Sequence, residues 1–405
     1  MKIRSLETFK ITLPFRFSFG HSLAARKESQ NLLVKITLNN GVTGWGEGVP
    51  RDYVTGESVD TAEENVLLRY APEIIGMSLD NPFDVMKNLK AAFEKLGLRK
   101  TANGASWCAV ETAILDAASK LVSKPLHGIF GQQKQDFIRY GGVVPFGKKK
   151  ALQAVLFFYK IYGFQTVKIK VGAQNLEDDL EKLRIARSIM GDNCILRVDA
   201  NCAWTVEQTL RASELFKPFN ISSIEQPLPA SDWEGLQKLS KEIEQDILVD
   251  ESLCTIQEAE DLARDRICNA FNIRISKAGG LLAAKEMVEI AKAHGLRIHL
   301  GAQVGESAIL SAAARHFAAT YEPFENYEGS ANGFLLKNDI CKENLTAGLG
   351  GKGSFSYAGK NFGLGIKVQD NFVLSFVETD SSNNSDDQRV NKVDTQNNPL
   401  SQSTR

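Results

Sequence analysis

Five charged residues stand at the ends of successive apolar runs in the middle of the chain. They are Lys170 in TVKIKV, Asp199 in ILRVDA, Glu225 in ISSIEQ, Asp250 in DILVDE and Lys277 in FNIRISK, and consecutive members are 25 to 29 residues apart. Carboxylate oxygens are the ligands that Mg²⁺ prefers, and a lysine amine can transfer a proton. Three acids between two lysines therefore indicate a divalent-metal site with a proton-transferring group on either side.

The spacing also predicts the elements that position these residues. An interval of 25 to 29 residues fits one strand, one helix and two loops, the repeating unit of a β/α barrel. Eight strand candidates and seven intervening helical patterns lie within residues 136–330. We therefore expect an α/β fold, a (β/α)7β modified TIM barrel in which the strand ends meet around one pocket. A single acid at a strand end often caps a loop or pairs with a base, but three on consecutive strands favour a metal site.

The rest of the chain has a different pattern. Residues 1–135 begin with alternating apolar and polar runs joined by Asn39-Asn40-Gly41, a hairpin signal, and continue with helical periodicity around 62–76 and 105–122. We expect them to form an α+β capping domain. Residues 331–378 have no clear helix and are expected to return to this cap. The polar tail, residues 379–405, is expected to be disordered.

The two lysines of the KIK run indicate the reaction. Lys168 and Lys170 are two residues apart on one strand, so both side chains point into the barrel. Lys277 reaches the same pocket from the other side of the ring. Mg²⁺ would stabilise the enediolate that forms when a substrate carboxylate loses its α-proton, with one amine over each face. The residues thus predict abstraction of the proton α to a carboxylate.

Several motifs together resemble the enolase superfamily. They are VKIKVG, DANCAW, IEQPL, VDES and SKAGG, and a KxK motif with a lysine on the sixth strand is similar to the muconate-lactonizing-enzyme subgroup, which includes muconate cycloisomerases and dipeptide epimerases. WGEG and GLGI also resemble the cap of this family, so the resemblance covers about residues 1–378. It implies one Mg²⁺ ion bound by Asp199, Glu225 and Asp250, with Lys170 and Lys277 as the acid/base residues.

The resemblance implies supporting residues as well. Lys168 would support Lys170 electrostatically, and Asn201 and Glu251 would support the metal ligands. Two cap loops, about residues 15–30 and 50–58, would close over the pocket. The candidates for substrate binding are His21, Arg26, Arg51, Tyr53, Gln303, Glu306 and Glu328. The first four have an alternative as solvated loop side chains.

The eighth strand departs from one pattern of the family. Dipeptide epimerases usually carry Asp-x-Asp there to bind an ammonium group, whereas this chain has Asn326-Tyr327-Glu328. A single acid, Glu328, could still meet a cation or donate a proton. The expected activity is an isomerase, either a racemase or epimerase or a cycloisomerase. The alternatives are a dehydratase or lyase of the same superfamily (o-succinylbenzoate-synthase-like or acting on acid sugars), a Schiff-base aldolase, and a non-catalytic binding protein.

The expected partner is a small-molecule carboxylate substrate, and composition points to no macromolecular partner. The chain has 48 basic and 49 acidic residues, which gives no reason to expect a nucleic-acid or membrane partner. The six cysteines form no CxxC pair, and no run of 18 apolar residues occurs, so we expect free thiols and a cytoplasmic protein. A homo-oligomer is expected from the family resemblance.

Overall fold

The computed structural model describes residues 1–20, 25–172, 175–355, 362–377 and 390–395, and it confirms the expected barrel. Eight parallel strands form one sheet in the order β12-β11-β10-β9-β8-β7-β6-β5. They are β5 (Gly142–Val144), β6 (Thr166–Lys170), β7 (Ile195–Asp199), β8 (Ile221–Glu225), β9 (Asp246–Val249), β10 (Ala270–Arg274), β11 (Arg297–Gly301) and β12 (Asn326–Tyr327). A parallel bridge between Tyr140 and Tyr327 joins the first strand to the last.

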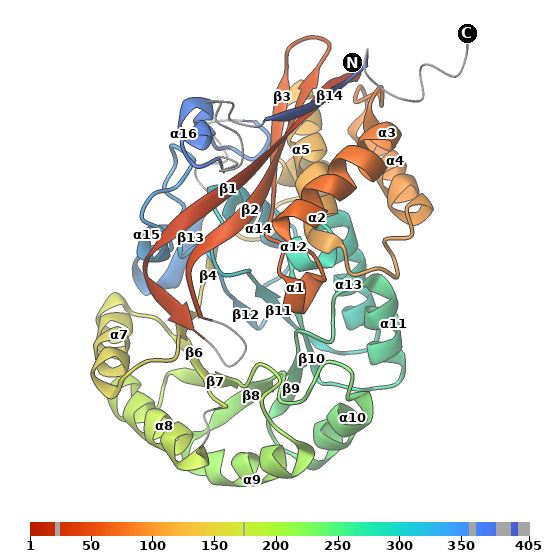
Figure 1. The fold of residues 1–405 in the computed structure, drawn as a ribbon. Helices are drawn as coiled ribbons and strands as arrows, with labels where there is room; N and C mark the ends of the chain where they lie inside the picture. The colour runs from red at the N-terminus through yellow and green to blue at the C-terminus, as the bar shows by residue number, and fades with distance from the viewer. Residues whose placement is uncertain (21–24, 173–174, 356–361, 378–389, 396–405) are drawn as a thin grey trace.

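Helices fill the seven gaps between these strands and cover the outside of the sheet (Figure 1). They are α7 (Lys149–Tyr162), α8 (Leu176–Met190), α9 (Val206–Phe216) with η2 (Lys217–Phe219), α10 (Trp233–Glu242), α11 (Ile256–Arg264), α12 (Ile275–Ala278) with α13 (Leu281–Ala293), and α14 (Ala308–Ala319). Several begin at capping residues; Thr205 and Thr255, for example, form capping boxes at the starts of α9 and α11. None of the described helices is both long enough and apolar enough to cross a membrane.

The N-terminal residues form an antiparallel sheet followed by helices. The sheet has the order β14-β1-β2-β3 and contains β1 (Ile3–Gly20), β2 (Ala25–Leu38), β3 (Thr43–Gly48) and β14 (Asn391–Asp394). The expected turn connects β2 and β3, with Gly41 at φ +84°. The helices are α1 (Asp52–Thr55), α2 (Val59–Glu64), the π-helix η1 (Asn65–Tyr70), α3 (Ala71–Ile74), α4 (Pro82–Lys95), α5 (Gly104–Leu121) and α6 (His127–Phe130).

Glycines of β3 let α5 pack directly on the sheet. A Cβ added at Gly44, Gly46 or Gly48 would lie 2.0 Å or less from a backbone oxygen of α5. These glycines are two residues apart, on one face of the strand, and the helix positions that they meet are alanines four residues apart: Ala105, Ala109 and Ala113. The matched small residues allow the backbones of strand and helix to approach closely. This packing fixes the apolar layer of the cap.

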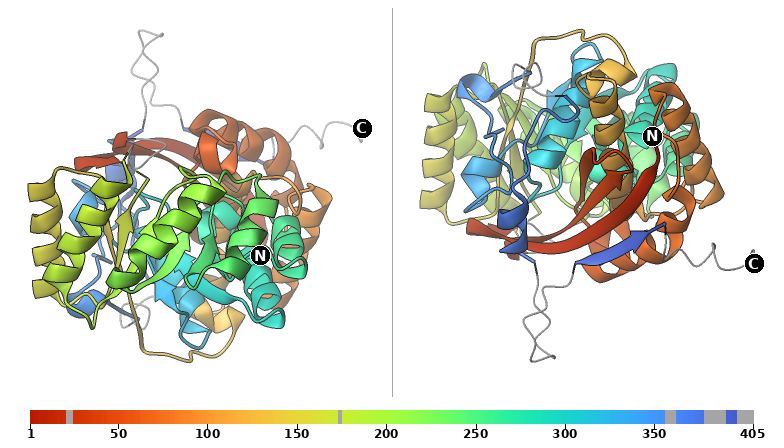
Figure 2. Two further views of the ribbon diagram at one scale, coloured as in Figure 1. Left: turned by 90° about the horizontal axis from the view of Figure 1, so that it is seen from below. Right: turned by 90° about the horizontal axis from the view of Figure 1, so that it is seen from above.

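The C-terminal residues run back along β1. Lys337 donates its backbone N–H to Pro14 (2.9 Å), and Thr12 donates to Phe376 (3.1 Å). The elements here are α15 (Asn332–Leu335), η3 (Leu349–Gly351), β13 (Lys352–Ser354) paired with β4 (Phe137–Arg139), and α16 (Asp370–Leu374). Within the tail that we expected to be disordered, Asn391–Asp394 instead form β14, which lies alongside β1 in the second view of Figure 2. The rest of that tail lies outside the described residues.

Two buried acids of the cap hold it to the barrel. Glu111 on α5 accepts hydrogen bonds from the backbone N–H groups of Leu281 and Leu282 at the start of α13. Glu47 on β3 accepts in the same way from Ser307 and Leu310 at the start of α14. The first backbone N–H groups of a helix have no partner within the helix, and a carboxylate there is favourable. The cap therefore supplies the N-terminal caps of two barrel helices.

Candidate active site

Both lysines of the KIK run point into the barrel and are buried. The Lys170 Nζ donates to Asp199 Oδ2 and to Asn201 Oδ1, each at 2.6 Å. The Lys168 Nζ lies 2.9 Å from Glu225 Oε2 and 2.7 Å from Glu328 Oε2. Burial alone would lower the pKa of Lys168, but the surrounding carboxylates outweigh it and raise the pKa. Lys168 is therefore held as a cation at the centre of an acidic group.

The three acids lie at the ends of neighbouring strands and are almost fully inaccessible to solvent. Asp199 is directly opposite Glu225 in the register of β7 and β8, and Asp250 follows β9. Burial would raise the pKa of Asp199, but Lys170 and Lys168 lower it to about 2. Burial, and then the charge of Asp199, raise the pKa of Glu225 to about 7. The opposite shifts show that Lys170 and Lys168 outweigh burial at Asp199, whereas burial dominates at Glu225.

The third acid is bound from the opposite side of the ring. The Lys277 Nζ donates to Asp250 Oδ1 at 2.8 Å and to the Asp250 backbone oxygen at 2.5 Å. Arg274, at the end of β10, pairs with Asp250 Oδ2 and donates to Gln303 Oε1 at 2.8 Å. Burial acts to raise the pKa of Asp250, and Arg274 and Lys277 together bring it below its usual value. The two proposed proton-transfer lysines thus contact different acids.

The donor set suits a hard divalent cation. Its oxygens come from three carboxylates on consecutive strands, the ligand type that Mg²⁺ prefers. Beside them, Asn201 donates to Glu251 Oε1 at 2.9 Å, whereas the buried Glu251 Oε2 has no hydrogen-bond partner among the described residues. Within the described residues, no three carboxylate, His or Cys side chains gather closely enough to hold a metal, because lysines and Arg274 contact the acids instead. The three carboxylates could therefore bind Mg²⁺ in place of the lysine and arginine charges that now neutralise them.

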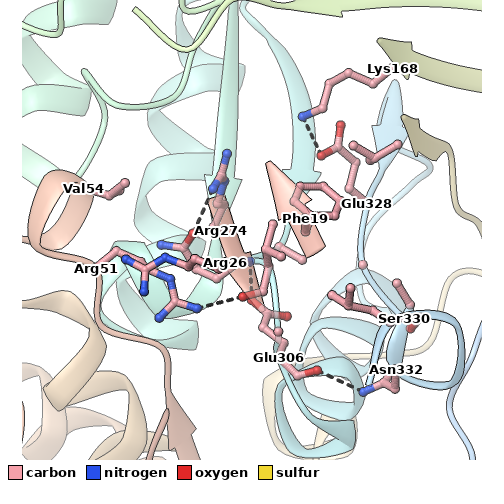
Figure 3. Close-up of a pocket in the computed structure, with 18 of the residues that line it drawn as sticks. Phe19, Arg26, Arg51, Val54, Lys168, Arg274, Glu306, Glu328, Ser330 and Asn332 are labelled. Atoms are coloured by element: carbon pink, nitrogen blue, oxygen red, sulfur yellow. Dashed lines mark hydrogen bonds and ion pairs between the residues drawn. The ribbon is translucent and has the colours of Figure 1, made fainter. Parts of the chain in front are cut away.

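A pocket of about 120 Å³ lies above these residues, between the strand ends and the cap. Figure 3 shows Arg26 and Arg51 reaching it from the cap, with Lys168, Arg274 and Glu328 on the barrel. Of the residues expected at the site, those lining the pocket are Arg26, Arg51, Tyr53, Lys168, Lys170, Asn201, Glu251, Gln303, Glu306 and Glu328. Asp199, Glu225, Asp250 and Lys277 do not line it and lie deeper. His21 lies outside the described residues.

The four candidates for substrate binding in the cap differ in accessibility. Arg51 is only 3% exposed, and its guanidinium donates to Pro50 O, Val304 O and Ser29 Oγ. Its donors are thus used to tie the loop after β3 to the loop after β11. Tyr53 is 38% exposed, and the Arg26 guanidinium lies 5.7 Å from its ring centre. Arg26 and Tyr53 therefore form one cation–π unit at the pocket wall.

The other candidates belong to loops at the strand ends. Glu306 is half-buried, and its Oε1 accepts the backbone N–H of Gln303 at 2.7 Å. Burial raises the pKa of Glu306 to about 8. Glu328 is bound on both oxygens, by Lys168 and by Arg197 (2.5 Å). The charge of Glu328 is therefore compensated by two cations, whereas Glu306 accepts a backbone N–H, which carries no charge.

Sequence reasoning missed two arginines of the site. Arg197 lies two residues before Asp199 on β7, and Arg274 lies three residues before Lys277, and both are buried. A charged residue inside an apolar run was the available signal. The rule that singled out Lys168, two residues before Lys170, applies equally to Arg197. Arg197 also contacts His299 Nδ1 at 2.9 Å, which accounts for a buried histidine in the middle of β11.

Comparison with known proteins identifies the family. The model for "Enolase C-terminal domain-like" matches residues 152–371, and the model for "Mandelate racemase / muconate lactonizing enzyme, N-terminal domain" matches residues 4–131. The chain belongs to the enolase superfamily, in the muconate-lactonizing-enzyme subgroup. The first range contains the barrel from α7 onward and part of the segment after β12, and the second contains the N-terminal sheet and its helices.

Relatives in this subgroup are isomerases. The L-Ala-D/L-Glu epimerase of Bacillus subtilis is 29% identical over 85% of this chain and 92% of its own length. The chloromuconate cycloisomerase of Cupriavidus pinatubonensis is 25% identical over 92% and 97%. A dipeptide epimerase from Enterococcus faecalis, solved with Mg and L-Leu-L-Tyr, superposes with a TM-score of 0.81 at 25% identity, covering 91% of this chain and all of that one. These findings confirm the expected class of enzyme and its subgroup.

Proposed function

We propose that this chain is a Mg²⁺-dependent racemase or epimerase that transfers the proton on the carbon α to a substrate carboxylate. The observation that carries this proposal is the placement of two buried lysines at opposite flanks of the three acids. Lys170 on β6 contacts Asp199, and Lys277 after β10 contacts Asp250, with β7, β8 and β9 between them. A planar intermediate held above the acids would have one amine on each face.

Each residue then has a defined task. Asp199, Glu225 and Asp250 would hold Mg²⁺, which supplies positive charge to the substrate carboxylate as the α-proton leaves. Lys170 or Lys277 takes the proton as a neutral amine, and the other returns a proton to the opposite face as an ammonium. Asn201 fixes the Lys170 amine through a 2.6 Å hydrogen bond. Lys168 and Arg197 neutralise Glu328 beneath the pocket.

The barrel and the cap would have different functions in the reaction. We propose that the barrel, residues 136–330, carries the chemistry, and that the cap, residues 1–135 with 331–378, encloses the substrate. Arg26, Tyr53, Gln303 and Glu306 remain our candidates for substrate contacts, because their side chains line the pocket. The donors of Arg51 are already used, so we propose that Arg51 positions the loop after β3.

The same lysine pair could serve a cycloisomerase, in agreement with the relationship to a chloromuconate cycloisomerase. The experiment that separates these reactions is a screen of N-acyl amino acids, dipeptides, lactones and sugar acids in D₂O. Proton NMR would report exchange at the α-carbon, and chiral chromatography would report the isomer formed. Exchange with racemisation supports the proposal, whereas ring formation or loss of a leaving group without such exchange contradicts it. EDTA should abolish the exchange, which would not happen for a Schiff-base aldolase.

We also propose that the protein functions in the cytoplasm. All six cysteines are free thiols in the structure, as expected in a reducing cytoplasm. The oligomeric state remains a prediction, and light scattering coupled to size-exclusion chromatography would measure it.

A further inference from the structure

A second cavity adjoins the pocket where the first barrel strand meets the last. Its volume is about 420 Å³, against about 120 Å³ for the pocket above the lysines. It lies between β5, α7 and the segment after β12, next to the end of β1, and we call it the seam cavity. Its walls include Phe17, Gly142, Val155, Phe158, Tyr159 and Phe334. A space of this size suits a substantial part of a small-molecule ligand.

The seam cavity and the pocket share one wall. Six residues line both: Phe19, Val143, Gly329, Ser330, Ala331 and Leu335. In Figure 3, Ser330 lies on the opposite side of the pocket from Val54 and Arg51, so the seam cavity extends away from the cap loop after β3. The seam cavity therefore borders the space that a molecule above the lysines would occupy.

The order of the strands in the barrel indicates toward which side a bound substrate would extend. The three acids lie at the ends of β7, β8 and β9, whereas the seam joins β12 to β5 on the far side of the ring. A substrate with its carboxylate at the acids and its α-carbon between the lysines would extend toward the seam. The seam cavity thus faces the end of the substrate that is remote from the carboxylate.

The walls of the seam cavity are apolar and aromatic. The ring centres of Phe158 and Phe334 are 5.6 Å apart in an edge-to-face arrangement, and those of Tyr159 and Phe164 are 4.9 Å apart. The Tyr159 hydroxyl is already used, because it donates to Val143 O at 2.8 Å. Arg16 is exposed and donates to Lys337 O. The interior therefore offers apolar contacts and few polar groups.

The charges around the seam cavity disfavour an ammonium group. No Asp or Glu is among the described residues that line it. The acid at the end of β12, Glu328, contacts both Lys168 and Arg197, and its two oxygens are already paired. Burying an ammonium group without an acid partner carries a large penalty. An uncharged group avoids this penalty.

We propose that the seam cavity binds the distal end of the substrate, and that this end is an uncharged, apolar group of about the size of a phenylpropanoyl chain. The inference rests on the proposed function, because that function places the substrate carboxylate and α-carbon over the acids and lysines. It selects, among carboxylates with an exchangeable α-proton, those with a neutral hydrophobic acyl or aryl extension.

Four derivatives of alanine test the proposal. N-(3-phenylpropanoyl)-L-alanine carries the apolar group, N-acetyl-L-alanine lacks it, L-Phe-L-Ala differs from the first by one ammonium group, and N-succinyl-L-alanine ends in a carboxylate. Dissociation constants would be measured calorimetrically with MgCl₂ present, and kcat/KM by α-deuteration. We expect the phenylpropanoyl compound to bind at least about tenfold more tightly than each of the other three, because it buries an aromatic group without a charge.

A variant that fills the seam cavity tests whether the tighter binding of the phenylpropanoyl compound arises there. Val155→Trp on α7 adds bulk to the seam cavity, and Val155 does not line the pocket above the lysines. It should weaken binding of the phenylpropanoyl compound about tenfold or more and leave the N-acetyl compound within about twofold. Ile161→Trp, on the same helix at an 84% exposed position, is the matched control and should change neither. Should Val155→Trp fail to fold, Phe158→Ala should weaken only the phenylpropanoyl compound.

The outcomes separate this inference from the proposed function. Equal binding of the acetyl and phenylpropanoyl compounds, tighter binding of L-Phe-L-Ala or N-succinyl-L-alanine, or equal effects of Val155→Trp on all ligands would overturn the inference, even if exchange occurs. The expected ranking of dissociation constants without α-proton exchange by any compound would support the seam cavity and contradict the proposed function.

Discussion

The Lys170 amine lies 2.6 Å from Asp199 Oδ2, so a proposed base and a proposed metal ligand neutralise each other. Lys277 and Asp250 form the equivalent pair at 2.8 Å on the other flank. A divalent cation bound by the acids would compete with both lysines for the same oxygens. Binding of such a cation would therefore be coupled to release of the two amines.

Added Mg²⁺ should stabilise the protein through these acids. At a concentration 100 times its dissociation constant, a ligand that binds only the folded state contributes about 2.7 kcal/mol to the free energy of unfolding. Differential scanning calorimetry should therefore show a rise in Tm with MgCl₂ that Asp199→Asn greatly reduces. Asp192→Asn, at an exposed acid, should keep the full rise. An equal rise in both variants would place the metal elsewhere.

Removal of Lys170 and removal of Lys277 should affect proton exchange with different enantiomers. Because each amine faces one side of the α-carbon, Lys170→Ala and Lys277→Ala should each lower turnover by at least about 100-fold. One variant should retain partial α-deuteration of the L-isomer only, and the other of the D-isomer only. Proton NMR in D₂O on separate enantiomers would measure this. Lys149→Ala, at an exposed lysine, is the control; loss of exchange with the same enantiomer in both variants would refute opposed faces.

The cap acid Glu111 should make stability depend on pH. Burial raises the pKa of Glu111 to about 7, although the N–H groups of Leu282 and Leu281 oppose the shift. A raised carboxyl pKa means that the folded state retains a proton that the unfolded state has released. The resulting stabilisation is complete below about pH 4.5 and is lost as the pH rises through about 7. Relative to Glu111→Gln, the wild type should lose up to about 1.4 kcal/mol per pH unit over that interval.

Urea unfolding of both proteins between pH 5 and 8 would measure this difference. Comparison with the Gln variant cancels contributions from other titrating groups, such as Glu47. A difference in free energy of unfolding that stays constant over this range would show that Glu111 keeps its charge when folded.

The ion pairs that Glu328 forms with Lys168 and Arg197 should contribute to stability in a coupled way. Glu328→Gln removes the charge that pairs with both Lys168 and Arg197, and loss of one partner from a buried ion pair costs about 3–5 kcal/mol. Glu225 still lies 2.9 Å from Lys168 and 3.9 Å from Arg197, so we expect a loss toward the lower end of that range. Lys168→Met should cost a similar amount, and the double variant clearly less than the sum of the two. Equilibrium unfolding of the four proteins gives the coupling energy. Additive losses would mean that the two residues stabilise the fold independently.

The close packing of β3 on α5 predicts that Gly46 cannot be replaced by a larger residue without loss of stability. The Cβ of Gly46→Ala would lie 1.9 Å from the Ala109 backbone oxygen, so strand and helix must separate. We expect a loss of about 2 kcal/mol or more in the free energy of unfolding. Gly147→Ala, where the nearest atom would lie 3.8 Å away, should change it by less than about 0.5 kcal/mol. Similar urea midpoints for both variants would contradict this account of the cap.

Much of the fold could be predicted because its signals are local. The eight strands and the Asn39-Asn40-Gly41 turn follow from periodicity and turn chemistry within short segments. Side-chain partners across the ring could not be predicted in this way, since Arg197 meets Glu328 131 residues away. Nor does the sequence reveal that Arg51 donates to two backbone oxygens and to Ser29 Oγ, because one of these oxygens belongs to the loop after β11.

The strand β14 was missed for a different reason. The segment NKVD is short and polar, and only the exposed edge of β1 makes it a strand. Its register pairs Thr8 with Asn391 and Ser5 with Asp394. Local composition therefore predicted disorder at a position where a distant partner imposes order.

That pairing also shields one margin of the cap. If the chain ended before residue 390, the backbone donors and acceptors of β1 from Ser5 to Thr8 would face solvent as an open strand edge, where another polypeptide could add. The last described segment thus protects this edge from edge-to-edge self-association, and versions that end before residue 390 should aggregate more readily than the 405-residue chain.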